Sequence, residues 1–451
     1  MPRLNKATTS QGFPPGIHHL YWFFFLNFPS CIVIMDSPIF LYAENLGASA
    51  TVMGLIAGMT PLMAVFQLPA ADHVNRVGYK RFVCAGWTLR QVFVLGLVAV
   101  PLLHGVLNPQ SQLAVVLAML LFYNLVRGIA SCGWFPWITG LVPEEIRGRY
   151  LLRENACANV GSLLASLLAA WYLGAHPQNR QFAVMFVFSL VTGLVSLWFL
   201  YRVPDAPVAE DEAALRHPVP WGAILRHGPF RKLLWVNLAW ALMAGGLMAF
   251  LVKFLKRDAL PMPDDQVMLA TSAKFVGGLA TLWLLDSRLD RFGSRPLMHT
   301  ALALCFLWVA GWLLMAGNVW PRSFAAVTAL HLGLGFSVAV FGMALTRLTM
   351  ATVPRMGRSH FFAIYSVTGS LMMGISPIAW GIFLDALQHV SWHWAGVEWN
   401  AFSLYFAVLL GLMVAVGALV QRVEETRAGR VEDLFSDFLR NSPFRFLRGR
   451  D

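Results

Sequence analysis

Long apolar runs recur along the whole chain, and they restrict its possible folds more than any other feature. Each run is about 18 residues or longer, which is enough for a helix to cross the hydrocarbon core of a bilayer. The strands of a membrane barrel would instead be short and alternating. The chain is 57% hydrophobic and only 13% charged, which is too little charge for a soluble protein of 451 residues. We therefore predict an all-α membrane protein with twelve transmembrane helices, at residues 18–43, 50–71, 82–104, 113–138, 151–175, 182–202, 232–254, 267–286, 297–316, 323–349, 360–385 and 399–421.

The net charge of +11 is distributed unevenly over the predicted loops. Most lysines and arginines lie in the loops on the side that holds both termini, which is typical of cytoplasmic loops. We predict a multi-pass protein of the inner (plasma) membrane with both termini in the cytoplasm, and no binding of nucleic acid. One outer loop disagrees with this assignment, because it contains Lys253, Lys256 and Arg257.

The cysteines give no sign of a metal site or of disulfides. None of the five has a partner at the spacing of metal ligands, and all lie in or at the ends of apolar runs: Cys31, Cys84, Cys132, Cys157 and Cys305. We expect them to fill the core, and we expect no cofactor. The first apolar run is too long for a signal peptide and has no clear cleavage site, so we predict that it is a retained span.

A short basic string occurs twice, roughly 215 residues apart, as NRVGYKR at 75–81 and DRFGSRP at 290–296. A second pair, Val-Pro at 142–143 and at 353–354, repeats at nearly the same interval. Such duplication predicts two six-helix halves, 18–202 and 232–421. A cytoplasmic linker, 203–231, joins them, and an N-terminal segment, 1–17, and a basic amphipathic tail, 422–451, flank them. The tail fits either a helix on anionic lipid or a segment that only sets the topology.

The two loops resemble the hallmark loop of the major facilitator superfamily, Gly-x-x-x-Asp-Arg-x-Gly-x-Lys/Arg-Lys/Arg. The first copy has Ala71 and Asn75 in place of the Gly and the Asp, and the second has Asp286 in place of the Gly. The resemblance covers essentially the whole chain. It implies a secondary transporter whose pseudo-symmetric halves rock around a central cavity. It also implies that the loops latch the halves in one state, through Asn75, Arg76, Gly78, Lys80, Arg81, Asp290, Arg291, Gly293 and Arg295. A loop that only sets the topology is the alternative.

Asp36 is the only acid well inside a predicted span, where an ionisable side chain costs at least roughly 2.5–3.5 kcal/mol. Pro29 and Pro38 flank it and are able to kink the helix. In the family that the chain resembles, the first helix lines the cavity, which makes Asp36 a candidate proton-coupling or cation site. A structural ion pair, or a place in a wet outer vestibule, would also explain it.

Basic groups lie inside several other spans. Arg127 fits a substrate anion or a pair with Asp36, and a lipid-facing side chain is the alternative. Lys274 fits an anionic substrate group or a snorkelling position at the outer rim. His331 either titrates or is simply hydrogen-bonded in the core. Arg90, in a span that is normally peripheral, is interpreted as structural. The predicted cavity residues are Asn27, Tyr123, Asn124, Arg127, Asn159, Asn237, Lys274, His331, Tyr365 and Thr368.

These groups favour a proton-coupled transporter of a small organic solute that is anionic or zwitterionic. We expect a monomer whose partners are the substrate, a proton or another cation, and membrane lipids. A lipid or amphiphile flippase, a drug exporter and a non-transporting membrane sensor remain alternatives. A membrane-embedded enzyme is not favoured, because the spans contain neither a His-Glu-x-x-His motif nor paired carboxylates.

Overall fold

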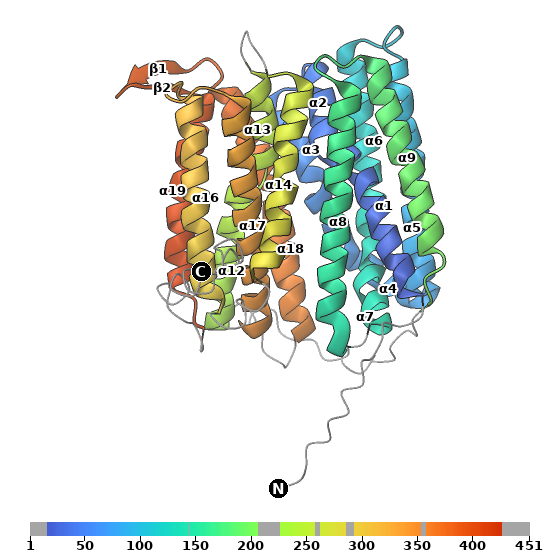
Figure 1. Cartoon of the computed structure of the whole chain (residues 1–451). Coiled ribbons are helices and arrows are strands. Elements are labelled where there is room, and N and C mark those ends of the chain that lie inside the picture. Colours follow the sequence, from blue (N-terminus) through green and yellow to red (C-terminus); the bar gives the residue numbers. More distant parts are fainter. Residues whose placement is uncertain are drawn as a thin grey trace, which may run out of the picture.

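The computed structural model describes residues 16–142, 144–205, 226–257, 262–285, 293–352 and 358–425. Nearly all of this part is a bundle of long helices that run side by side (Figure 1). The first half contains α1 (Ile17–Met35), α2 (Ser37–Asn45), α3 (Ala50–Met63), η1 (Ala64–Phe66), α4 (Gln67–Val77), α5 (Tyr79–Leu102), α6 (Pro109–Ala130), η2 (Ser131–Gly133), α7 (Trp134–Leu141), α8 (Glu144–Leu173) and α9 (Asn179–Leu200).

The second half has the same kind of elements and one addition that was not predicted. It contains α12 (Gly228–Ala244), α13 (Leu247–Lys256), α14 (Asp264–Leu285), α16 (Ser294–Ala316), α17 (Phe324–Thr352), α18 (Arg358–Ala386), β1 (Ser391–Trp394), β2 (Val397–Asn400) and α19 (Ala401–Gln421). The addition is the antiparallel hairpin formed by β1 and β2, which precedes α19.

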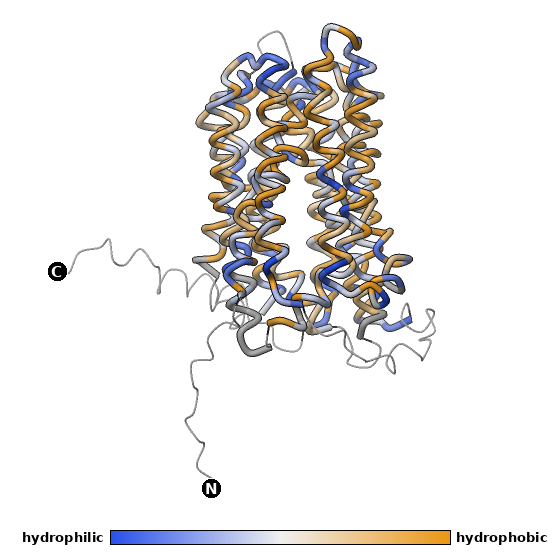
Figure 2. Tube along the Cα trace, turned by 90° about the vertical axis from the view of Figure 1, so that its right-hand side faces the viewer, coloured by the Kyte–Doolittle hydropathy of each residue, from blue (hydrophilic) through white to orange (hydrophobic). Residues whose placement is uncertain are grey.

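The predicted spans are confirmed, and each coincides with one helix or with one broken helix. In the described part, eleven helices are long and apolar enough to cross a membrane. The remaining predicted span is α14, a helix of 22 residues that carries Asp264, Asp265 and Lys274. It packs inside the bundle against α8 and α17. Figure 2 shows apolar residues along the helices and hydrophilic residues gathered at the two ends.

Each half is held together by its own helix packing. In the first half α1 packs on α8 and α9, and α5 packs on α6 and α9. In the second half α17 packs between α14 and α16, and α12 packs on α18. Large apolar side chains such as Val92, Leu95, Trp171, Leu307 and Val414 remain exposed on the outside of the bundle. This is the arrangement of a protein whose outer surface faces lipid.

The backbone repeats itself between the halves, which supports the predicted duplication. Gly78 immediately precedes α5 with φ 91°, and Gly293 immediately precedes α16 with φ 85°. These positive φ angles explain why both copies of the basic loop contain glycine at this position. The first helix of each half is also broken, at Asp36 in one and at Gly245 and Gly246 in the other. The two breaks lie roughly 210 residues apart, which is close to the loop repeat.

The halves meet closely at the end of the bundle opposite to residues 16 and 425, which we call the distal end (Figure 1). Here α3 of the first half crosses α18 of the second, and small residues make the crossing close. A Cβ placed on Gly54 would lie 2.1 Å from the carbonyl oxygen of Pro377, and one on Gly58 would lie 2.3 Å from that of Gly374. Only glycine allows the two backbones to approach this closely.

Candidate functional site

Asp36 lies at the break between α1 and α2. Its backbone is extended, with φ −132° and ψ −157°, and Pro38 in the first turn of α2 fits a helix that starts anew at this point. The carboxylate accepts hydrogen bonds from the backbone N–H of Ser37 at 2.7 Å and from its hydroxyl at 2.9 Å. The acid therefore caps the N-terminus of a half-helix in the interior of the bundle, where the helix dipole favours a negative charge.

The partner of Asp36 comes from the other half of the protein. Lys274 Nζ, from the middle of α14, donates to both carboxylate oxygens of Asp36 at 2.7 and 2.6 Å. Only 23% of the Asp36 side chain and 12% of the Lys274 side chain are exposed. The pair is therefore Asp36 with Lys274, and the alternative pairing with Arg127 is wrong for this conformation. Beside the pair, the Ser37 and Thr271 hydroxyls are 2.9 Å apart and form a second bond between the halves.

Further polar contacts join the halves closer to the distal end. Lys253 Nζ pairs with Glu44 at 3.0 Å and donates to the carbonyl of Ala48 at 2.7 Å. Asp385, at the end of α18, accepts from the backbone N–H groups of Ala50 at 2.9 Å and Thr51 at 2.8 Å, so it caps α3 across the interface. We call Asp36, Glu44, Lys253, Lys274 and Asp385 the distal gate.

The distal gate explains the outer loop that disagreed with the charge distribution. Lys253 is bound by Glu44, Lys256 forms an ion pair with Asp264, and Arg257 donates to Asn400 at 2.8 Å. These cations hold structure together rather than marking the side of the membrane. Glu44 and Asp385 were not among the residues predicted from the sequence. Each is an acid at the outer end of an apolar run. An ordinary loop residue has the same sequence context, so the sequence could not distinguish the two cases.

Two of the predicted cavity residues, Asn237 and Tyr365, line a cavity of about 280 Å³ between the halves. Its walls come from α3, α12 and α18, and consist of Pro61, Asn237, Trp240, Ala241, Tyr365, Ser366, Gly369, Ser370 and Met373. The Asn237 amide donates to the carbonyl of Tyr365 at 3.1 Å, which leaves its oxygen for another donor. Thr368, also on α18, donates to the carbonyl of Ile364 at 2.7 Å.

Three other predicted residues lie on helices that face the second half or the interior of the first. Asn159 contacts α14, because a Cβ on Gly278 would be 3.0 Å from its amide oxygen. The buried Asn124 accepts from Thr60 at 2.8 Å and so ties α6 to α3. Arg127 follows on α6 and is half-buried.

Asn27 and Tyr123 are the two predicted cavity residues that lie around Arg90. Both are buried inside the first half, and neither lines the cavity of 280 Å³. Asn27 accepts a hydrogen bond from Arg90, whose guanidinium lies 5.6 Å from the ring centre of Tyr123 and 5.1 Å from that of Trp87. Asn27 of α1 therefore faces α5. Arg90 is thus the centre of a buried polar cluster, in line with its structural interpretation.

His331 is completely buried on α17. Its Nδ1 lies 2.9 Å from the carbonyl oxygen of Val327, one turn earlier on the same helix. Its ring meets that of Trp312 edge to face, with 5.1 Å between the ring centres. Nδ1 is thus hydrogen-bonded within the core, whereas Nε2 is buried without a hydrogen-bond partner in the described part of the chain.

The start of α16 is bound to the end of α19 and to the residues that follow it, up to Glu425. Glu425 accepts from the backbone N–H groups of Ser294 at 2.8 Å and Arg295 at 2.9 Å, and from the Arg347 guanidinium at 3.0 Å. The Arg295 guanidinium donates to the carbonyl of Gln421 at 2.9 Å. All of these contacts lie within the second half. Of the predicted latch residues, Asp290, Arg291 and the side chain of Asn75 lie outside the described part, whereas Arg76, Gly78, Lys80, Arg81, Gly293 and Arg295 lie within it.

Replacing Glu425 by Gln is expected to destabilise the protein by about 1–3 kcal/mol, because charge-assisted bonds to two backbone N–H groups and to Arg347 are lost together. Thermal unfolding in detergent would measure the change. A midpoint equal to that of the wild type would show that Glu425 does not hold α16. The neighbouring exposed Arg422→Gln is a suitable control, with little expected effect.

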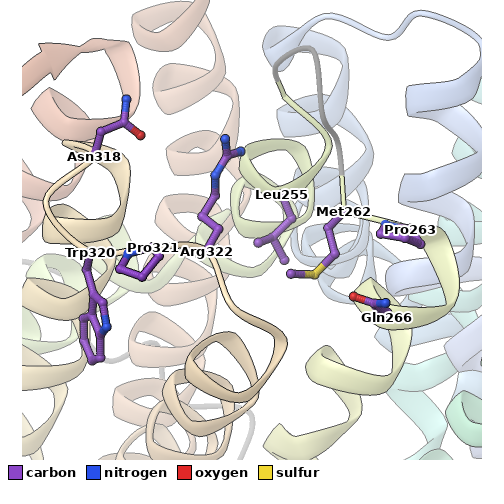
Figure 3. A pocket seen from close by; sticks show the side chains of 8 residues that line it. All are labelled: Leu255, Met262, Pro263, Gln266, Asn318, Trp320, Pro321 and Arg322. Atoms are coloured by element: carbon purple, nitrogen blue, oxygen red, sulfur yellow. The ribbon is translucent and has the colours of Figure 1, made fainter.

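Two further cavities open at the distal end. One, of about 450 Å³, is lined by Leu255, Met262, Pro263, Gln266, Asn318, Trp320, Pro321 and Arg322 and belongs to the second half alone (Figure 3). The other, of about 250 Å³, adjoins the distal gate at Lys253 and Asp385. Within the described residues, no group of three or more His, Cys, Asp or Glu side chains is placed to hold a metal ion.

The sequence of this chain matches the family model of the Major Facilitator Superfamily over residues 21–377. The chain belongs to the Major Facilitator Superfamily. Solved structures of this fold include a D-xylose-proton symporter, with a TM-score of 0.68 at 15% identity over 92% of this chain and 98% of that one. The nucleoside transporter NupG has a TM-score of 0.62 at 13% identity, covering 91% and 99%. The xylose transporter XylE from E. coli, in an inward open conformation, has a TM-score of 0.65 at 16% identity, covering 93% and 97%.

No curated protein sequence matches the chain. The identities to the solved structures are low, so these likenesses concern the fold. As a superfamily member, the protein has the general architecture of a membrane transporter, built from two six-helix halves. The distal gate and the 280 Å³ cavity both lie between those halves.

Proposed function

We propose that the protein is a proton-coupled secondary transporter of a small anionic or zwitterionic organic solute, and that Asp36 is its proton-coupling residue. The observation that carries the proposal is the ion pair between Asp36 and Lys274. It joins the two halves at a helix break inside the membrane-spanning bundle. In transporters built of two repeats, ions and substrates bind near such breaks.

The distal end can open only if α2 and α14 separate, and this separation breaks the ion pair. Two isolated charges in a medium of low dielectric constant are costly, so each needs a new partner. A buried carboxylate without a cation favours its neutral form and binds a proton. Lys274 would then be free to bind an anionic group of the substrate. Proton and substrate would bind together as the distal gate opens, and both would leave as the pair forms again.

The cavity supports a small substrate. Its volume of about 280 Å³ lies at the lower end of the range of ligand pockets. Asn237 supplies an amide, and Trp240 and Tyr365 supply aromatic surface that suits an organic solute. A D-xylose-proton symporter and a nucleoside transporter are among the proteins that share the fold, which is compatible with a solute of this size.

We further propose that the chain is a monomer in the inner membrane, with both termini in the cytoplasm. The distribution of loop charge supports this orientation, and the distal end would then face outward. With the distal gate formed, the structure would correspond to a state closed on the outer side. Flippase, drug-export and sensor functions become outcomes of the experiment below.

The first test is a thermal-shift screen of the purified protein at two pH values against organic acids, amino acids, sugars, amphiphilic cations and lysolipids. A ligand that binds the folded state raises the unfolding midpoint. The hit is then used in proteoliposomes. Asp36→Asn is expected to abolish accumulation driven by a proton gradient and to retain exchange of labelled for unlabelled substrate, because exchange needs no net movement of protons.

The matched control is Ser37→Ala, which removes the hydroxyl that bonds Asp36 and Thr271 but leaves the carboxylate and Lys274 in place. It should accumulate substrate. Full accumulation by Asp36→Asn would refute proton coupling at this residue. Hits restricted to amphiphilic cations or lysolipids would favour an exporter or a flippase. Binding without flux in the wild-type protein would favour a sensor.

A further inference from the structure

The hairpin formed by β1 and β2 has one aromatic and one polar face. Its register pairs Trp392 with Trp399 and Trp394 with Val397. Residues opposite each other, and residues two apart on one strand, point to the same side of a sheet. These four side chains therefore share one face. The other face carries the alternate pairs, His393 with Glu398 and Ser391 with Asn400.

The turn and the aromatic contacts fix this arrangement. Ala395 and Gly396 form a two-residue loop in which both φ angles are positive, at 55° and 77°, as in a tight hairpin turn. The rings of Trp392 and Trp399 are stacked with 6.3 Å between their centres, and those of Trp394 and Trp399 are 6.4 Å apart. Nevertheless 45% of Trp392 and 68% of Trp394 remain exposed. So much aromatic surface on one small face indicates a binding surface.

The hairpin is attached firmly to the second half at its base. The backbone N–H of Glu398 donates to the carbonyl of Gly317 at 2.9 Å, and its carboxylate accepts from Asn318. The Asn400 amide donates to the carbonyl of Ala316 at 2.8 Å and accepts from Arg257. From this base the hairpin projects sideways beyond α16 and α19, level with the distal ends of the helices (Figure 1).

We propose that this hairpin is an interfacial anchor whose tryptophans lie among the lipid headgroups of the leaflet at the distal end. Its position is that of a membrane–water interface, because it leaves the bundle sideways at the level where the spans end. The segment to which it is bonded through Gly317 and Asn318 also exposes apolar side chains, among them Leu314, Val319 and Trp320. The proposal needs only that the bundle spans a membrane, so it stands apart from proton coupling.

The backbone of the hairpin limits how deep it can lie. Most N–H and C=O groups along the outer edges of a two-stranded sheet have no strand partner, and such edges do not enter the hydrocarbon core. Tryptophan prefers the interface because its ring is apolar and its N–H donates a hydrogen bond. Both properties place the aromatic face in the headgroup layer, with His393 and Glu398 toward water. The anchor would hold the second half at a fixed depth.

The test compares two labelled positions on opposite faces of one strand. Trp394→Cys and, as the matched control, His393→Cys are labelled from the distal side with an impermeant, environment-sensitive fluorophore. The wild-type protein, treated with the same fluorophore, measures the background labelling of the five native cysteines. Both variants are reconstituted in phosphatidylcholine vesicles that carry bromine either near the acyl carbonyl groups or near the chain ends. Elution volume and unfolding midpoint verify that each variant is folded.

The label at 394 should show blue-shifted emission and lose more intensity to the shallow bromine than to the deep one. The label at 393 should emit as in water and be quenched less. A second check needs no label. The triple variant Trp392→Ser/Trp394→Ser/Trp399→Ser should lose part of the tryptophan emission that the shallow bromine quenches in the wild type. Water-like emission at 394 in vesicles would overturn the proposal. A blue shift that occurs only in native membranes would also overturn it, by indicating a protein partner.

Discussion

Replacing Lys274 by Ala is expected to lower the free energy of unfolding by about 3 kcal/mol, because it leaves the carboxylate of Asp36 largely buried without a cation. The same change should loosen the distal end, since the pair joins α14 to the break between α1 and α2. We expect Asp36→Ala to have an effect of similar size, and the double variant to be much less damaged than the sum of the two. Removing both charges removes the penalty of an unpaired one.

The measurement is a double-mutant cycle on unfolding of the detergent-purified protein. A coupling energy above about 1 kcal/mol between the two positions is expected for residues in direct contact. The matched control is the cycle on Lys232 and Glu424, an ion pair within the second half whose side chains are 40% and 67% exposed. The ammonium of Lys232 lowers the pKa of the Glu424 carboxyl through a hydrogen bond, but water screens the pair, so little coupling is expected. Additive effects at Asp36 and Lys274 would refute the inter-half pair.

Replacing Gly58 by Ala is expected to shift the protein toward a state with the distal end open. The new Cβ would lie 2.3 Å from the carbonyl oxygen of Gly374, a backbone atom that cannot rotate away. Overpacking of this kind costs roughly 1–3 kcal/mol, and the cost falls only on the state in which α3 and α18 touch. An energy of that size changes the ratio of the two states about 5- to 150-fold.

Spin labels at His176 and Gln388, exposed positions at the distal end of the two halves, would report the distance between them. The population with the longer distance should grow in Gly58→Ala. Gly411→Ala is the matched control, because a Cβ on this glycine of α19 meets no atom within 4 Å. An unchanged distance distribution in Gly58→Ala, with a stability equal to that of the control, would show that the crossing does not limit opening.

Much of the fold could be predicted from residues 17–421 because the signals are local. Run length alone specified the spans, and the repeated loops specified the halves. Gly78 and Gly293 illustrate the reason. Each has a positive φ in a tight connection, and glycine adopts such a φ without the help of residues elsewhere in the chain. The hairpin was missed because its strands have four residues each and lie between two much stronger apolar signals.

The site was predicted only in part. Burial depth singled out Asp36 and Lys274 as residues that needed a reason, because charge inside a span is costly wherever it occurs. The sequence did not identify the partner of either residue. The one pairing predicted for Asp36 was with Arg127, whereas Lys274 occupies that place in the structure. Asn27 shows the same limit, since it is as polar as Asn237 but faces Arg90 inside its own half.

The sequence by itself determined the membrane class, the twelve spans, the duplication and the superfamily, since each depends on the length and order of residues along the chain. Only the tertiary structure decided which charges meet, where the halves touch and which polar residues line the space between them. Those outcomes depend on how each helix is rotated about its axis and on where it breaks. Asp36 contacts Lys274 across roughly half the chain because a break turns one helix and packing positions the other.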